Sequence, residues 1–181
     1  MNRCIANLIL LATLAWAATP ALAALDVGDK APDFAIDASM GGNVYKFKLA
    51  DELKKGPVVL YFFPAAFSVG CTIEAHAFAE ATDQYRALGA SVIGVSHDDI
   101  DTLKRFSVAE CRSKFPVGAD ADHSVMKSYD SVLTLMPDYA SRTSYVIAPD
   151  HTIVYSYTSL NPAKHVNNTM NALKAWSTTK R

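Results

Sequence analysis

Runs of apolar residues and alternations of apolar with polar residues predict several strands along the chain. Residues 58–63 are all apolar or aromatic, which is typical of a strand covered on both faces. Residues 91–96 carry Val92, Ile93 and Val95 and predict a second buried strand. Residues 44–49 alternate instead, which predicts a half-buried strand that pairs with residues 34–37 across a glycine turn.

Apolar side chains at spacings of three and four residues predict helices. A helix over residues 71–88 has a stripe formed by Phe78, Ala81, Tyr85 and Leu88. A second helix is expected from a cap at Asp99 to about residue 113, which places Cys111 near its C-terminal end. A third is expected from Pro162 to about residue 176, with an inner side formed by Val166, Met170, Leu173 and Trp176.

The order of these elements predicts the fold class. The helix between the two buried strands makes a βαβ unit, whose strands are parallel neighbours. Residues 143–148 and 152–157 predict an antiparallel hairpin, and the last helix follows it. This plan is that of an α/β, thioredoxin-like fold, with a central mixed sheet flanked by helices and an N-terminal β-hairpin extension.

The first 23 residues have the features of a secretory signal peptide. Arg3 is the positive residue, an apolar run follows, and residues 21–23 form a small-x-small cleavage site. The apolar run is shorter than the roughly 20 residues that a membrane-spanning helix needs. We therefore expect cleavage after residue 23, a single domain over residues 24–181, no membrane attachment after cleavage, and a periplasmic or secreted location.

Charge and cysteine content narrow the function classes. The whole chain has 17 basic and 18 acidic residues, and we find no basic run, which argues against a nucleic-acid partner. Removing the signal peptide leaves two cysteines, Cys71 and Cys111. In an exported protein such a pair is most often a structural disulfide, so the first question is whether this one is structural or catalytic.

Cys71 lies where the buried strand ends and a helix begins. The first turn of a helix has backbone N–H groups without intrahelical partners and the positive end of the helix dipole. Both favour a thiolate over a neutral thiol. The position of Cys71 therefore indicates a reactive cysteine.

Three segments resemble the peroxiredoxins, specifically the bacterioferritin-comigratory or Q-type branch of the AhpC/TSA (alkyl hydroperoxide reductase and thiol-specific antioxidant) superfamily. They are residues 27–34 (VGDKAPDF), residues 64–74 (PAAFSVGCTIE) and residues 142–147 (RTSYVI). The resemblance spans nearly the whole mature chain and implies that Cys71 attacks the peroxide and becomes a sulfenic acid.

The resemblance also implies roles for the residues around the nucleophile. Pro64 shields the pocket, Ser68 stands where the family has a threonine whose hydroxyl contacts sulfur and peroxide, and Arg142 brings positive charge beside the thiolate. Glu74 orients the arginine rather than titrating during turnover.

The chain departs from the family pattern at three positions. Ser68 replaces the threonine and loses the methyl group that limits its rotamers. Val69 replaces a common proline, and His76 stands where many Q-type members carry their resolving cysteine. By resemblance, Cys111 is then the resolving residue, and forming its disulfide with Cys71 requires the start of the first helix to unwind.

The sequence thus predicts a thiol-dependent peroxidase for hydrogen peroxide and small organic hydroperoxides, reduced by a thioredoxin-like dithiol partner. No metal, flavin or haem is implied, and relatives suggest a monomer or weak dimer. Clusters at residues 97–101 and 120–123 contain histidine and aspartate, but loop solvation and helix capping explain them without a metal. Two alternatives stay open: a one-cysteine peroxidase resolved by an external thiol, and a non-catalytic thioredoxin-fold protein with a structural disulfide.

Overall fold

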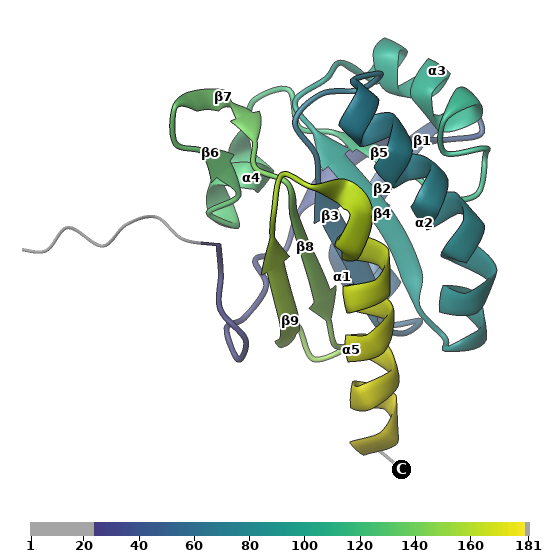
Figure 1. The fold of residues 1–181 in the computed structure, drawn as a ribbon, viewed down its shortest axis with the longest axis vertical. Helices are drawn as coiled ribbons and strands as arrows, with labels where there is room; N and C mark the ends of the chain where they lie inside the picture. Colours follow the sequence, from purple (N-terminus) through teal and green to yellow (C-terminus); the bar gives the residue numbers. More distant parts are fainter. Residues whose placement is uncertain (1–23, 180–181) are drawn as a thin grey trace, which may run out of the picture.

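A seven-stranded mixed sheet forms the centre of the computed structural model, which describes residues 24–179 (Figure 1). The strand order is β2-β1-β5-β4-β3-β8-β9. Strands β3, β4 and β5 are parallel, whereas β8 runs antiparallel to β3, and β1 runs antiparallel to β5. The bounds are β1 Ala35–Met40, β2 Asn43–Lys48, β3 Val58–Phe62, β4 Ser91–Ser96, β5 Val117–Ala119, β8 Thr143–Ile147 and β9 Ile153–Thr158.

The predicted N-terminal hairpin is confirmed and extends this sheet. Strands β1 and β2 pair antiparallel from Ala35 opposite Lys48 to Met40 opposite Asn43. Gly41 and Gly42 form the turn with φ of 57° and 81°, a left-handed conformation that glycine adopts without steric cost. Because β1 also pairs with β5, the hairpin becomes one end of the sheet.

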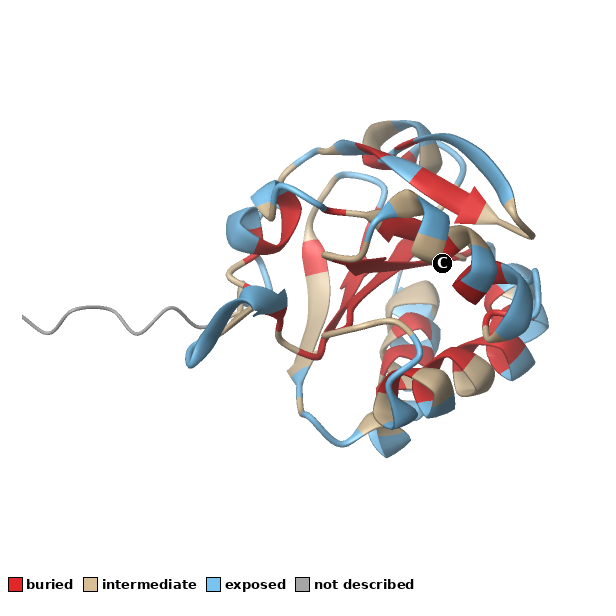
Figure 2. Ribbon diagram, turned by 90° about the horizontal axis from the view of Figure 1, so that it is seen from above, coloured by how far each residue is buried: buried red, intermediate tan, exposed pale blue. Residues whose placement is uncertain are grey.

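Helices cover both faces of the sheet. On one face lie α2 Val69–Ala87, α3 Ile100–Ala109 and α5 His165–Thr179, and a short 3-10 helix, η1 Pro162–Lys164, precedes α5 (Figure 1). The other face is covered by α1 Leu49–Leu53 and α4 Ser124–Ser128. Figure 2 shows the buried residues concentrated on the strands and on the inner faces of the helices, with the exposed residues outside.

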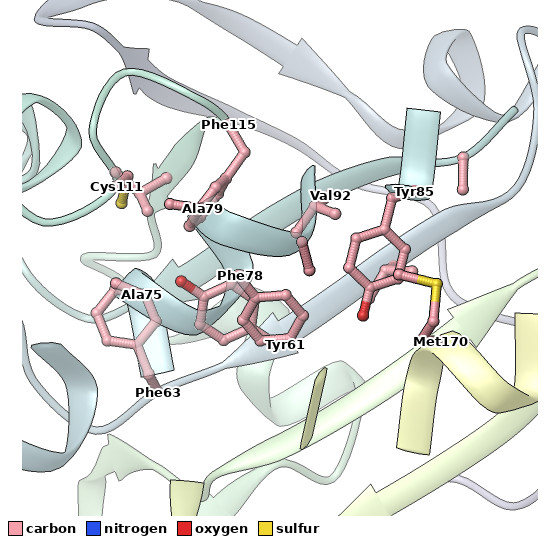
Figure 3. Close-up of a cluster of buried hydrophobic side chains, with 14 of the residues drawn as sticks. Tyr61, Phe63, Ala75, Phe78, Ala79, Tyr85, Val92, Cys111, Phe115 and Met170 are labelled. Atoms are coloured by element: carbon pink, nitrogen blue, oxygen red, sulfur yellow. The ribbon is translucent and has the colours of Figure 1, made fainter. Parts of the chain in front are cut away.

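Strand β3 lies at the centre of two hydrophobic cores, as its continuous apolar sequence predicts. All five of its residues are buried. Tyr61 faces α2 and stacks on Phe78 with ring centroids 4.3 Å apart (Figure 3), while Leu60 faces the opposite core. Full burial of an aromatic or aliphatic side chain stabilises a fold by about 1.5–3 kcal/mol, so these layers hold β3 rigidly.

Several short elements were not predicted, and one helix is shorter than expected. Helices α1 and α4 and the hairpin of β6 Val132–Leu133 with β7 Met136–Ala140 each contain too few residues to show a clear period. The prediction that the second helix reaches residue 113 is wrong, because α3 ends at Ala109. Arg112 and Ser113 have φ of 50° and 56°, which is incompatible with a continuing helix.

The predicted signal peptide, residues 1–23, lies outside the described residues. Its cleavage and the resulting domain over residues 24–181 therefore stay predictions. No helix within residues 24–179 is long and apolar enough to cross a membrane.

Candidate active site

Cys71 is the third residue of α2 and is buried, with 1% of its surface exposed. The residue before the helix, Ser68, is extended and makes no capping bond through its side chain, and the first turn has no acidic residue. The positive end of the helix dipole is therefore not neutralised locally by a carboxylate. The predicted placement of Cys71 at a helix N-terminus is confirmed.

Arg142 reaches Cys71 because of the strand register. It directly precedes β8, and β8 pairs with β3 so that Thr143 lies opposite Phe62 at the end of β3. The guanidinium then donates from Nη2 to the Cys71 Sγ at 3.3 Å. A Cβ at Gly70 would lie 3.0 Å from Nη2, so the missing side chain of Gly70 leaves room for this approach.

Glu74 lies one turn further along α2 and completes the group. Its Oε2 accepts a hydrogen bond from Arg142 Nη1, and Arg142 Nε donates to the carbonyl oxygen of Leu160 at 3.1 Å. Because Glu74, Leu160 and Cys71 each bind a different nitrogen of the guanidinium, the group is held in an orientation that faces the sulfur. The structure thus brings together Cys71, Arg142 and Glu74, as the sequence motifs predicted.

Burial shifts the pKa of the Glu74 carboxyl. Glu74 is fully buried, which raises its pKa to about 8, even though Arg142 opposes the shift. Burial lowers the pKa of Arg142, but the negative charges of Glu74 and Cys71 outweigh this effect and the net shift is upward. The arginine is therefore a permanent cation in the site, held between the Glu74 carboxyl and the Cys71 sulfur.

The loop before α2 carries the other two predicted residues. Pro64 is half-buried at the start of this loop, and Ser68 is exposed at its end. The Ser68 hydroxyl donates to the carbonyl oxygen of Ala65 at 2.9 Å. The hydroxyl is thus directed at Ala65, and its contact with sulfur and peroxide stays a prediction.

Cys111 lies just after α3, not within it, and is fully buried. Cys71 and Cys111 are both free thiols. Burial raises the pKa of the Cys111 thiol well above its ordinary value, and the negative charge of Glu110 adds to this effect. In this conformation Cys111 is therefore a protonated thiol in an apolar setting, which Figure 3 shows beside Phe115 and Ala79.

Two side-chain contacts, one of them an ion pair, hold the Cys111 segment against α2. Glu110 contacts His76 with an Oε2–Nε2 distance of 2.7 Å, and Arg112 contacts Glu80 with an Nη1–Oε1 distance of 3.1 Å. The residues on both sides of Cys111 are thus attached to the helix that carries Cys71. His76 therefore has a defined contact with the residue that precedes Cys111.

Sequence reasoning missed two residues that support the site. Asp98 accepts hydrogen bonds from the Ala66 N–H and the Ser96 hydroxyl, both at 2.8 Å, and so anchors the loop before α2. Its position just after β4 could have indicated that it lies near the Cys71 loop, because the carboxyl ends of parallel strands meet at one edge of a sheet. His165, beside Glu74, carried no signal, since it is a lone histidine distant in sequence.

The histidine and aspartate clusters have structural roles. Asp99 caps α3 by accepting from Thr102 N–H at 2.7 Å, and Asp120 accepts from the Val125 and Met126 N–H groups. Within residues 24–179 there is no group of three or more metal-ligating side chains that could hold an ion. The prediction that Asp99 caps the helix after β4 is confirmed.

The family follows from comparison with known proteins. The AhpC/TSA family model matches residues 27–156 of this chain. The chain belongs to the AhpC/TSA family. Its match includes the cysteine motif and the arginine-bearing strand described above, and it confirms the peroxiredoxin resemblance read from those motifs.

Individual AhpC/TSA relatives support the Q-type branch. Peroxiredoxin Q, chloroplastic, of Triticum aestivum is 32% identical over 148 residues, covering 81% of this chain and 66% of the relative. The structure is similar to BcpB of Mycobacterium tuberculosis, with TM-score 0.74, 28% identity, and coverage of 82% of this chain and 96% of that one. It is also similar to a PrxQ mutant of Xylella fastidiosa, with TM-score 0.76, 25% identity, and coverage of 86% and 99%. The chain therefore spans just under two thirds of the wheat relative but nearly all of both solved structures.

Proposed function

We propose that this protein is a thiol-dependent peroxidase that reduces hydrogen peroxide and small organic hydroperoxides. The observation that carries the proposal is the contact of Arg142 with the Cys71 sulfur at the start of α2. Family membership supports the same reaction class.

In the first step the Cys71 thiolate attacks one peroxide oxygen and the O–O bond breaks. The sulfur becomes a sulfenic acid, and the other oxygen leaves as hydroxide or alkoxide and takes up a proton. The guanidinium of Arg142 and the unpaired N–H groups at the start of α2 supply the positive charge that this transition state needs. Because the arginine is held by Glu74 and Leu160, little reorganisation accompanies the reaction.

In the second step the thiol of Cys111 attacks the sulfenic sulfur of Cys71, releasing water and forming a disulfide. Both cysteines are buried and free in the described conformation. The segment that carries Cys111 must therefore move, and the start of α2 must unwind, before the sulfurs reach bonding distance of about 2.05 Å. A dithiol of thioredoxin type then supplies two electrons and restores both thiols.

We propose a periplasmic or secreted location from the N-terminal sequence, where an exported thioredoxin-like protein would be the reductant. A monomer or weak dimer is expected from the branch to which the chain is similar. Sedimentation of the reduced and oxidised protein tests the second point.

A single-turnover experiment tests the mechanism. The pre-reduced protein, Cys71→Ser and Cys111→Ser are each mixed with one equivalent of peroxide, and products are followed by intact mass. We expect the parent to consume one peroxide and lose two hydrogen atoms, and Cys111→Ser to gain one oxygen atom. Cys71→Ser should consume none.

Other outcomes select the alternatives. A parent that gains oxygen without forming a disulfide indicates a one-cysteine peroxidase resolved by an external thiol. A parent that consumes no peroxide after full reduction indicates a non-catalytic thioredoxin-fold protein.

A further inference from the structure

A buried histidine lies beside the backbone segment that holds Arg142, at a place to which the peroxidase mechanism assigns no role. His165 is the first residue of α5, which packs against β8 and β9 (Figure 1), and it has no exposed surface. A buried imidazole needs hydrogen-bond partners, because an unpaired polar atom in the interior destabilises the fold. The identity of those partners indicates what the ring holds in place.

Two hydrogen bonds fix the ring of His165. Nε2 lies 2.9 Å from the carbonyl oxygen of Ser159, and a carbonyl oxygen only accepts, so Nε2 carries the hydrogen. In the neutral ring Nδ1 is then an acceptor, and the Ser144 hydroxyl donates to it at 2.8 Å. Burial lowers the pKa of His165 to about 4, which keeps the ring neutral. Glu74 Oε1 lies 3.6 Å from Nδ1, beyond hydrogen-bond distance, so the partners of the ring are Ser144 and Ser159.

The segment that His165 binds also supplies a partner of Arg142. Ser159 directly follows β9, and its N–H donates to the Arg142 carbonyl oxygen at 3.0 Å, which continues the pairing of β8 with β9. The next carbonyl oxygen along the chain, that of Leu160, accepts from Arg142 Nε at 3.1 Å. Neighbouring carbonyl groups of one segment therefore bind the imidazole and the guanidinium.

Apolar packing contributes little to holding this segment. The Leu160 side chain is 65% exposed, and Asn161 after it is exposed as well. The hydrogen bond from His165 instead attaches the segment to a fully buried side chain, which Ser144 of β8 holds from the other side. The imidazole thus joins the sheet to the backbone that contacts the guanidinium.

We propose that His165 is a positioning residue for the peroxidase reaction, because it fixes the backbone segment whose carbonyl group orients Arg142. Without the bond to Nε2 the segment shifts, and the bond from Arg142 Nε to Leu160 weakens with it. The guanidinium is then held less firmly beside the Cys71 sulfur, so the transition state of peroxide attack loses stabilisation by positive charge. The effect on rate rests on the proposed peroxidase function, whereas two of the tests below do not need that function.

Two amide substitutions separate the two hydrogen bonds of the ring. The amide nitrogen of His165→Gln lies as many bonds from Cα as Nε2 does, so this variant keeps a donor for the Ser159 carbonyl. The shorter side chain of His165→Asn keeps only a partner for the Ser144 hydroxyl. We expect single-turnover peroxide reduction to slow about tenfold in His165→Asn and to stay within about threefold of the parent in His165→Gln. Equal rates in the two variants would overturn the proposal.

The orientation of Arg142 is measured by NMR of its Nε–H group, whose signal is assigned by its loss in Arg142→Lys. We expect hydrogen exchange at Nε to become about tenfold faster in His165→Asn and to change little in His165→Gln. Because Arg142→Lys has no Nε–H group, His165→Asn should slow peroxide reduction by less than about twofold in that background. An unchanged Nε–H exchange, or fully additive losses of rate, would contradict the positioning role.

Thr169→Val is the matched control on the same helix. The buried Thr169 hydroxyl lies 2.7 Å from the Tyr85 hydroxyl and otherwise bonds to carbonyl oxygens of α5. Its removal should lower the urea midpoint but leave the peroxide rate at the parental value. A loss of rate in Thr169→Val as large as that in His165→Asn would show that any loosening of α5 has this effect, and would refute the proposal.

Alkylation of Cys71 by iodoacetamide separates this role from the proposed function. The reaction needs the thiolate but no peroxide, and peptide mass identifies the modified cysteine. We expect alkylation of Cys71 to slow about threefold in His165→Asn and to stay near the parental rate in His165→Gln. If no variant reduced peroxide but alkylation and Nε–H exchange still differed in this way, the proposed function alone would be contradicted. Equal alkylation in both variants would count against the role of His165.

Discussion

Replacing Asp98 by alanine should loosen the loop that precedes the reactive cysteine. The Asp98 carboxylate is the partner of the Ala66 N–H and of the Ser96 hydroxyl, both at 2.8 Å. The next loop residue, Phe67, has φ of 61°, and its ring packs edge-on against Phe106 with centroids 5.2 Å apart. A left-handed phenylalanine persists only where its surroundings hold it there, and the Asp98 bonds are part of that restraint.

The expected loss of stability follows from these contacts. Two hydrogen bonds to a charged acceptor contribute about 1.5–3 kcal/mol each, and the buried Ser96 hydroxyl would lose the acceptor of its hydrogen. Two effects reduce this loss. Phe67 can leave its left-handed conformation, which stabilises the variant by about 1–2 kcal/mol, and water can bind the half-buried Ala66 N–H. We therefore expect a net loss of about 2–3 kcal/mol in the free energy of unfolding.

The rate of Cys71 oxidation should fall more than stability alone explains. The anchored loop carries Pro64 and Ser68, and a displacement of about 1 Å in a positioning segment costs up to about 100-fold in rate. We expect a decrease of about tenfold to 100-fold in single-turnover peroxide reduction for Asp98→Ala. Asp98→Asn keeps one acceptor for Ala66 and should recover part of the rate.

The adjacent aspartate provides the matched control. Asp99→Ala removes the cap of α3 and should cost about 1 kcal/mol, but the hydrogen bonds of the Asp99 carboxylate go to Thr102 in α3 and not to Ala66. Urea unfolding and stopped-flow oxidation are measured for both variants. An Asp98→Ala protein that keeps the parental oxidation rate would refute the anchoring argument, as would an equal loss of rate in Asp99→Ala.

Three further predictions concern stability and the resolving step. Burial raises the pKa of Glu74 to about 8 in the folded protein, so between about pH 4.5 and 8 the folded state binds a proton that the unfolded state has lost. The free energy of unfolding should therefore fall as pH rises through this window. In urea titrations at several pH values, Glu74→Gln should remove this pH dependence. His76→Ala removes the contact with Glu110 and should speed disulfide formation about twofold, as expected for a coupling of about 0.5 kcal/mol. Quenched-flow mass measurements test this, and an unchanged rate would show that the contact does not restrain Cys111. Ser113→Gly should raise the urea midpoint, because the strain of the left-handed Ser113 exceeds the entropy that glycine adds to the unfolded chain by about 0.5 kcal/mol. A lower midpoint would contradict this.

The sequence predicted the features that depend on local pattern and strand burial. The all-apolar sequence of β3 and the helix stripe after Cys71 were clear because each side of the sheet is covered by helices. The contact of Arg142 with Cys71 was predicted from family resemblance, and the structure supplies its physical cause in the pairing of Thr143 with Phe62. Local periodicity does not reveal the register between distant strands, so the contact of Arg142 with Cys71 was predicted from the motifs alone.

The features that escaped prediction depend on contacts between distant residues. His165 meets Glu74 only because α5 packs beside α2, and 91 positions separate the two residues in the sequence. The end of α3 was missed because no proline or glycine follows Ala109 directly, and the left-handed residues that close it are an arginine and a serine. The direction of the Ser68 hydroxyl depends on its rotamer, which the sequence does not specify.

The two cysteines occupy opposite electrostatic settings, and this difference sets the order of the proposed reaction. Cys71 lies at the positive end of α2 and contacts a guanidinium, whereas Cys111 lies among apolar side chains next to an acidic residue. Peroxide attack requires a thiolate, so it begins at Cys71. We propose that Cys111 becomes a competent nucleophile only when its segment leaves the core, a movement that would break the contacts of Glu110 and Arg112 with α2. In the proposed reaction, burial thus keeps the Cys111 thiol protonated and away from Cys71 until the structure around the oxidised cysteine opens.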